Sequence, residues 1–216
     1  MNQQYFIEKN FLVLCFHKMI FPVFPLNGAI LFPNTNLPLN IFEDRYIDMV
    51  NYALGKKRLI GMIQSNEEGD LYKIGCVGKI HSFNETADGR YLISLQGTTC
   101  FEINNELKVD YKFRMVKCNL IQNIDEVEDR FTNDEKSFLL DSFKKYIEIK
   151  KINLDLAEIE KIEFIQLVKF IAMVSPFNYI EKQTLLETKN QREFYSKLVS
   201  IIELEIFSGL ENKSIN

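Results

Sequence analysis

The spacing of hydrophobic residues changes character near residue 122. Before that point, apolar residues come in short runs separated by glycine, asparagine and charged residues, a pattern typical of β-strands joined by turns. After residue 123, apolar residues recur every three or four positions, a spacing typical of helices. A strand-rich half followed by a helical half predicts an α+β fold.

The strand-rich half also carries signals for its turns and its curvature. Gly75 and Gly78 lie inside one apolar run, and glycine within a strand predicts a bulge or strong coiling, as in a small closed barrel. Asp88-Gly89 predicts a hairpin turn with positive φ at both central positions, and Gly97 breaks the run that follows. The predicted strands cover residues 58–64, 71–83, 90–97, 98–103 and 111–121.

Prolines mark the segment 21–50. They follow Phe21, Phe24, Phe32 and Leu37, and because proline has no N–H, we expect each at a sheet edge, a strand start or a turn. The segment therefore predicts short apolar strands bent at fixed points, followed by one helix. That helix is predicted over residues 43–54, with one face formed by Tyr46, Ile47, Val50 and Leu54.

Four further helices are predicted after residue 131. Thr132 and Glu135 have the spacing of a capping box, which starts a helix with an apolar face. That face comprises Phe138, Leu139, Phe143, Tyr146 and Ile147. A single long helix is predicted over residues 153–174 and ends at Ser175-Pro176, since proline cannot continue a helix. The last two are predicted over residues 178–188 and 192–207.

Composition and charge narrow the function classes. The chain has 216 residues, 46% of them hydrophobic, which excludes disorder and allows a substantial core. Residues 1–121 carry 13 basic and 12 acidic side chains, and the remainder carries 13 and 18. No basic stripe is present, so the charge pattern does not indicate nucleic-acid binding. The acidic helices are interpreted as solvated faces.

Cysteine and histidine are sparse and widely spaced. The four cysteines lie at Cys15, Cys76, Cys100 and Cys118, without a CxxC pair, and His17 and His81 add no metal-ligand spacing. We interpret the thiols as buried or inert in a reducing compartment, and His81 as a half-exposed strand residue. No metal or cofactor site is predicted.

The N-terminus holds one short apolar run, residues 11–16. It is shorter than the apolar core of a signal peptide and far shorter than a membrane span. Residues 1–18 are interpreted either as an extension or as the product of a start codon assigned too far upstream, and the chain as a cytoplasmic protein without a membrane segment.

Two groups of charged residues invite a functional interpretation. Glu43 and Arg45 could form a partner-facing pair, but at a spacing of two on a helix they are expected to point apart. Asp88-Gly89-Arg90 could form a ligand loop, but turn chemistry alone accounts for it. Both groups are predicted to be structural.

The opening of the chain resembles a known family. The run FPVFPLNGAILFPNTNLPLNIFEDRY is similar to the start of the N-terminal domain of Lon-type ATP-dependent proteases. In that family the order is P-L-F-P-L, an apolar pair with F-P-G, then L-P-L-x-I-F-E-x-R-Y. Asn34 stands where the family usually has glycine.

Three later segments extend the likeness over most of the chain from Met19. YKIGCVGKI, DGRYLISLQGTTCFEI and EKQTLLETKNQREFYSKLVSII resemble family motifs in the same order. Cys100 departs from the family pattern, which usually has arginine there. The matching positions, interpreted as mainly structural, are Phe24, Pro25, Leu26, Phe32, Pro33, Leu37, Pro38, Leu39, Ile41, Phe42, Glu43, Arg45, Tyr46, Gly75, Asp88, Gly89, Arg90, Gly97 and Phe101.

The resemblance implies both a fold and a role. It implies a PUA-like β pseudobarrel of about six strands followed by a C-terminal helical bundle, dividing the chain into residues 1–18, 19–122 and 123–216. It also implies a non-enzymatic module that holds unfolded or damaged protein segments, or that acts as an adaptor or regulator of proteolysis. The implied partners are unfolded segments or a partner protease, with self-association also open.

Catalysis and RNA binding are the alternatives. Lon proteases need a P-loop and a Ser–Lys dyad, but Gly55-Lys56 lacks the flanking P-loop residues and no G-x-S-x-G is present. RNA binding is the second function hypothesis, because PUA-type barrels often bind RNA. The net charge and the excess of lysine over arginine stand against it.

Phe42 and Tyr46 are predicted to be buried, anchoring the early helix.

Overall fold

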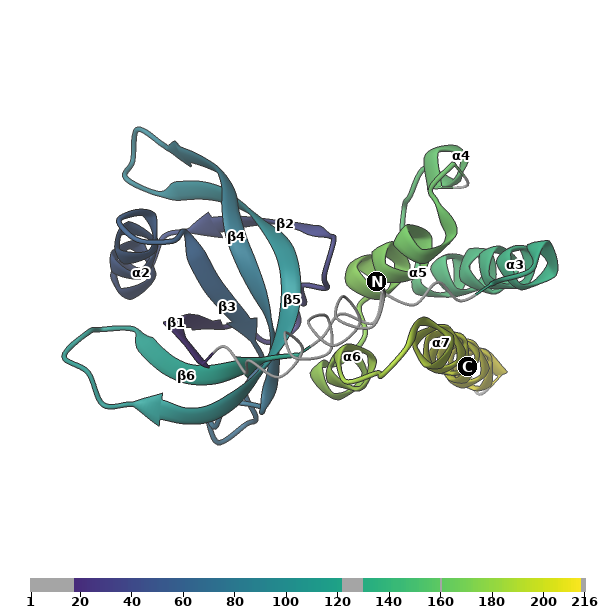
Figure 1. Ribbon diagram of the computed structural model, residues 1–216. Helices are drawn as coiled ribbons and strands as arrows, with labels where there is room; N and C mark the ends of the chain where they lie inside the picture. The colour runs from purple at the N-terminus through teal and green to yellow at the C-terminus, as the bar shows by residue number, and fades with distance from the viewer. Residues whose placement is uncertain (1–17, 122–129, 160, 215–216) are drawn as a thin grey trace, which may run out of the picture.

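The computed structural model describes residues 18–121, 130–159 and 161–214, and it has a β half beside a helical half (Figure 1). The α+β prediction is therefore confirmed. The strands are β1 Lys18–Pro25, β2 Asn36–Ile41, β3 Leu59–Ile63, β4 Ile74–Glu85, β5 Tyr91–Leu107 and β6 Arg114–Leu120. The helices are α2 Asp44–Leu54, α3 Asn133–Lys150, α4 Leu156–Ile159, α5 Phe164–Val174, α6 Tyr179–Leu186 and α7 Gln191–Ser214.

Five strands close into a barrel, and the sixth is attached to its wall. The sheet order is β2-β5-β4-β3-β1-β6, and β5 also pairs with β6, which closes the ring. β2 pairs with the first half of β5, from Tyr91 to Gln96. Only β1 and β3 run parallel among these pairs, and α2 lies in the connection between them. The predicted pseudobarrel is thus present.

The interior of the barrel is centred on the side chain of Phe101. The phenyl ring of Phe101 packs edge-on against that of Phe21, with 5.1 Å between the ring centroids. A Cβ added at Gly75 would lie 2.6 Å from the Phe101 ring, so glycine provides the room that this ring occupies. The buried residues around it come from all five ring strands: Phe21, Val23, Ile63, Val77, Phe101, Val116 and Cys118.

A second, larger core joins the barrel to the helices. It extends from Tyr46 and Val50 of α2, through Leu95 of β5, to Leu167 of α5 and Leu198 of α7. Tyr46 packs against Phe24 with ring centroids 4.3 Å apart. The two halves therefore share one continuous apolar interior. The division of the chain at residues 18 and 122 remains a prediction.

Phe42 corrects one sequence prediction. Its side chain is 64% exposed, whereas Tyr46 is buried as expected. Glu43 is the N-cap of α2 and has an extended backbone, so Phe42 precedes the helix. The i,i+4 argument that placed it beside Tyr46 does not apply outside a helix.

Element boundaries account for further corrections. The helix predicted over 153–174 is two helices, because Glu163 caps a new one by accepting from the N–H groups of Ile165 and Gln166. The strand predicted from residue 111 begins at Arg114, and the one predicted from residue 71 begins at Ile74. Phe138, predicted to face inward, is 48% exposed.

Two turn predictions were also wrong in detail. In the β4–β5 hairpin, Gly89 has a φ of 81°, and no other residue of the turn has positive φ. β5 runs without a break through Gly97, although the register with β4 shifts there, as at a bulge. A Cβ at Gly97 would lie 2.0 Å from the Phe32 carbonyl oxygen, so glycine allows a close approach of the chain at this point.

Candidate protein-binding groove

β2 presents an open sheet edge. Within the described residues, β5 is the one strand that pairs with it. Gly97 donates its N–H to the Thr35 carbonyl, so the backbone groups of Thr35 point toward β5. Because the backbone groups of successive strand residues point to opposite edges, those of Asn36, Pro38 and Asn40 point away from β5. Pro38 has no N–H. The outer edge therefore offers three carbonyls and two donors to an incoming chain.

An apolar groove runs between the start of β2 and α5. Its volume is about 450 Å³. One wall comes from the turn before β2 and from Leu37 and Pro38, and the other comes mainly from α5, where Val174 is exposed. The groove is lined by Asn34, Thr35, Asn36, Leu37, Pro38, Ile162, Gln166, Phe170, Met173 and Val174. This combination of apolar wall and free strand edge suits an extended peptide.

A buried lysine fixes the two walls of the groove relative to each other. Lys169 of α5 is 1% exposed, and its ammonium donates to the Pro33 carbonyl at 2.9 Å. Pro33 lies inside the turn that forms one wall, and Lys169 lies between the α5 residues that form the other. A hydrogen bond from a buried charge is stronger than one between neutral groups, so this contact ties α5 firmly to the turn before β2.

The turn before β2 is locked by its own contacts. Thr35 donates its hydroxyl to the Phe32 carbonyl at 2.8 Å and accepts from the Phe32 N–H at 3.2 Å. Asn34 has a φ of 62°, the left-handed region that favours glycine or asparagine. Its N–H donates to the Gly97 carbonyl. This geometry explains why asparagine can replace the glycine of the family pattern here.

α6 supplies a second joint between barrel and helices. Lys182, also buried, donates to the Gly28 carbonyl at 2.6 Å, and desolvation lowers the pKa of Lys182 below its ordinary value. Gln183 donates to the Ile74 carbonyl and accepts from the side-chain amide of Gln64. Sequence reasoning matched Lys182 and Gln183 to a motif but assigned them no role. No other signal in the sequence marked them, because they stand in a run of four polar residues, 181–184, typical of an exposed helix face.

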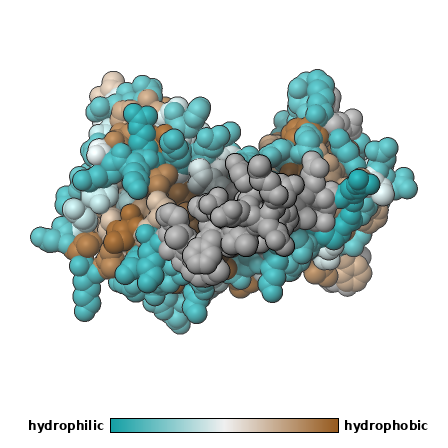
Figure 2. Space-filling view, viewed as in Figure 1, coloured by the Kyte–Doolittle hydropathy of each residue, from teal (hydrophilic) through white to brown (hydrophobic). Residues whose placement is uncertain are grey.

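A second surface lies at the far end of the barrel. A pocket of about 260 Å³ is lined by Lys18, Lys56 and Lys57 together with apolar residues and Tyr52, and none of the described residues that line it is acidic. Tyr52 also contacts Tyr111 on the exposed β5–β6 loop. Hydrophobic atoms, coloured brown, gather on this end of the barrel (Figure 2).

The motif residues divide into a buried set and an exposed set. Phe24, Phe32, Pro33, Ile41, Tyr46, Gly75, Gly97 and Phe101 are buried, whereas Pro25, Leu26, Leu37 and Leu39 are partly buried. Pro38, Phe42, Glu43, Arg45, Asp88, Gly89 and Arg90 are exposed. Of the whole set, the groove contains only Leu37 and Pro38.

The exposed charged residues of the motif form local pairs. Arg45 binds Glu43 at 2.8 Å, so the expectation that they point apart was wrong, because Glu43 lies before the helix and not on it. Arg90 binds Asp88 at 3.0 Å across the hairpin turn. Exposed pairs of this kind contribute little stability. His81 is exposed on β4.

The described residues contain no membrane-length apolar helix and no cluster of three or more His, Cys, Asp or Glu side chains suited to a metal ion. Cys76, Cys100 and Cys118 are free thiols, and Cys15 lies outside the described residues.

Two solved structures share this fold. The Lon N-terminal domain protein of Xanthomonas campestris is 18% identical, with a TM-score of 0.61 over 83% of this chain and 97% of that one. The N-terminal domain of the Mycobacterium avium complex Lon protease is 16% identical, with a TM-score of 0.60 over 86% of this chain and 98% of that one.

Sequence relatives agree with the fold. The Lon proteases of Flavobacterium johnsoniae and of Buchnera aphidicola subsp. Baizongia pistaciae are each 28% identical over 202 residues, covering 86% of this chain. The chain spans about a quarter of the length of these relatives. The family model for the substrate-binding domain of the ATP-dependent protease La (LON) matches residues 20–203. The chain therefore belongs to the Lon substrate-binding domain family.

Proposed function

We propose that this protein binds extended, apolar segments of unfolded or damaged proteins in the groove between β2 and α5. The observation that supports this most directly is the free edge of β2 beside an apolar wall. Backbone hydrogen bonds to the edge would hold any sequence, and the wall would favour apolar side chains. Membership of a substrate-binding family supports the same role.

The size of the groove sets the expected affinity. Burying one large apolar side chain contributes about 1.5–3 kcal/mol, and a few backbone hydrogen bonds add about 1 kcal/mol each. Ordering a flexible peptide offsets much of this gain. Binding in the micromolar range, at a Kd of about 1–100 μM, is the result. Such binding suits a module that captures and releases clients, by itself or for a partner protease.

We propose further that the chain acts by binding and without cutting peptide bonds. The described side chains at the groove include no acid–base pair or activated nucleophile, since its polar lining consists of asparagine, threonine and glutamine. Purified protein that degraded casein, with activity retained after removal of contaminating proteases, would contradict this part of the proposal.

Fluorescence anisotropy with labelled casein tests the groove. Val174→Asp places a charge on the exposed apolar wall and is expected to weaken binding about tenfold or more, equivalent to about 1.4 kcal/mol. Leu204→Asp, on the exposed face of α7, is the matched control and should bind like the wild type. Equal affinity in both variants, or no binding of casein by the wild type, would refute the proposal.

RNA binding, the alternative, would use the lysine-lined pocket at the other end of the barrel. Lys18, Lys56 and Lys57 could contact phosphates, and Tyr52 could stack on a base. A gel shift with structured RNA that weakens with salt and is lost in Lys56→Glu would support this function. That result would leave the Val174→Asp comparison unaffected.

A further inference from the structure

Two cysteines face each other across neighbouring strands. Cys76 of β4 and Cys100 of β5 are direct partners in the antiparallel register. The Cys100 carbonyl accepts from the Ile121 N–H, so the backbone of Cys100 is directed away from β4. The two cysteines therefore form a non-hydrogen-bonded pair, in which Cα atoms lie about 4.5 Å apart, within the range that a disulfide spans.

The two thiols are in contact and one of them borders a cavity. The side chains of Cys76 and Cys100 are joined by a hydrogen bond. Cys76 is fully buried, whereas Cys100 is partly buried and lines a pocket of about 280 Å³ between the barrel and helices α6 and α7. A small molecule that enters this pocket meets Cys100 first.

We propose that Cys76 and Cys100 form a reversible dithiol site, in which Cys100 reacts with a small disulfide and Cys76 then closes an intramolecular disulfide. In the first step the Cys100 thiolate attacks one sulfur of the small disulfide. A mixed disulfide forms, and the other sulfur leaves as a thiol, taking up a proton. In the second step Cys76 loses its proton, attacks the Cys100 sulfur and expels the second small thiol. Two protein thiols are oxidised and one disulfide is reduced.

Burial assigns the order of the two steps. Desolvation raises the pKa of the Cys76 thiol well above its ordinary value, so Cys76 is a poor first nucleophile. Cys118 is not a competitor, because it is buried among the side chains inside the barrel and contacts the Met19 carbonyl. The site is separate from the β2–α5 groove, which contains neither cysteine.

Oxidised glutathione is the probe, applied to the reduced full-length chain and followed by mass spectrometry of non-reduced peptides. The wild type is expected to yield a Cys76–Cys100 crosslinked peptide that dithiothreitol cleaves. Cys76→Ser should stop at a mixed disulfide on Cys100. Cys100→Ser should leave Cys76 unmodified while folded and reactive in urea, which confirms that the thiol is intact.

A measurement on the wild type alone guards against variants that fail to fold. In brief alkylation with iodoacetamide, Cys100 is expected to react at least about ten times faster than Cys76. The proposal is wrong if Cys76 reacts as fast as Cys100, or if the mixed disulfide on Cys100 never resolves. It is equally wrong if crosslinks to Cys118 or Cys15 dominate, or if the folded chain does not react.

Discussion

Phe42 and Tyr46 show that the position of a residue relative to the start of a helix decides whether its side chain is buried. Both belong to the segment that resembles the Lon family, but Phe42 precedes the N-cap of α2, and Tyr46 lies on its inner face. An exposed aromatic residue at a motif position is more informative about function than a buried one. It stands at the end of β2, the strand whose outer edge is free.

Truncating Phe42 should therefore have little effect on stability. Phe42→Ala is expected to lower the free energy of unfolding by less than about 1 kcal/mol, because the side chain is already in solvent. Phe24→Ala, which removes a buried partner of Tyr46, should cost about 3–5 kcal/mol. Urea denaturation of the two variants makes the comparison. Similar losses in both would mean that Phe42 packs in solution.

Because of Cys118, the free energy of unfolding is expected to depend on pH in the alkaline range. Burial raises the pKa of its thiol from 9.0 to about 11. A raised pKa in the folded state means that the stabilising contribution is complete below about pH 9. It is then lost as the pH rises through about 11.

The check is a set of urea melts under reducing conditions across that range. The free energy of unfolding of the wild type is expected to fall with pH between about 9 and 11. Cys118→Ala should fall less steeply over the same interval, because tyrosines titrate in both proteins but the thiol in only one. Parallel curves would show that the Cys118 thiol ionises as easily in the folded protein as in the unfolded one.

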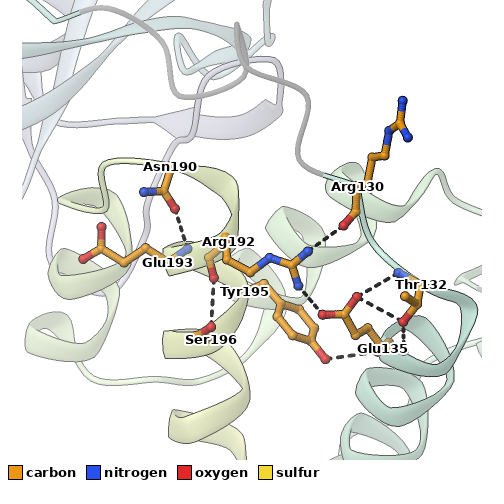
Figure 3. A network of polar contacts seen from close by, with 8 residues as sticks. All are labelled: Arg130, Thr132, Glu135, Asn190, Arg192, Glu193, Tyr195 and Ser196. Atoms are coloured by element: carbon orange, nitrogen blue, oxygen red, sulfur yellow. Dashed lines mark hydrogen bonds and ion pairs between the residues drawn. The ribbon is translucent and has the colours of Figure 1, made fainter.

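Among the elements, α3 and α7 are joined by a network that starts from a capping box. The Thr132 hydroxyl caps α3 by accepting a hydrogen bond from the Glu135 N–H, and the Glu135 carboxylate accepts one from the Thr132 N–H (Figure 3). The same carboxylate forms an ion pair with Arg192 of α7, and Tyr195 donates its hydroxyl to the Glu135 carbonyl (Figure 3). Hydrogen bonding to the Thr132 N–H, helped by Arg192, lowers the pKa of Glu135.

Thr132→Ala is the test at this scale. It removes the cap that fixes the start of α3 and is expected to cost about 1 kcal/mol. Ser137→Ala, an exposed position within the same helix, is the control and should change stability by less than about 0.5 kcal/mol. Thermal melts of both are sufficient. A loss in the control equal to that in Thr132→Ala would show that the cap has no special role.

Features that depend on residues close in sequence could be predicted, and features that depend on distant residues could not. The capping box at Thr132 and the turn glycine at Gly89 depend on neighbours within a few residues, and both were located correctly. The split between α4 and α5 was missed, since a side-chain cap at Glu163 competes with a continuous apolar spacing. The groove was beyond reach, because its walls are far apart in sequence and are brought together by Lys169 and the Pro33 carbonyl.

At the scale of the molecule, Lys169 joins the two halves. Lys169→Met keeps the length and the apolar stem but leaves the Pro33 carbonyl without its charged donor. The free energy of unfolding is expected to fall by about 1–3 kcal/mol. Casein binding should also weaken, because the α5 wall of the groove loses its fixed distance from the turn before β2.

Lys145→Met, at an exposed position on α3, is the matched control and should retain both stability and binding. The two readouts separate two possibilities. Reduced stability with unchanged casein binding would show that Lys169 serves the fold alone. An unchanged free energy of unfolding would show that the Pro33 carbonyl finds another donor.

The pairing of β1 with β6 has a consequence for synthesis on the ribosome. Lys18 pairs with Asn119, so the first strand of the barrel must wait for the last one to be translated. At about 5–20 residues per second, that wait is roughly 5–20 s, during which Phe21 and Val23 have no β6 partner. Pro22 and Pro25 interrupt the same strand, and proline in an exposed apolar strand resists pairing with other chains. The prolines that shape the finished barrel thus also protect the nascent chain from aggregation before the ring can close.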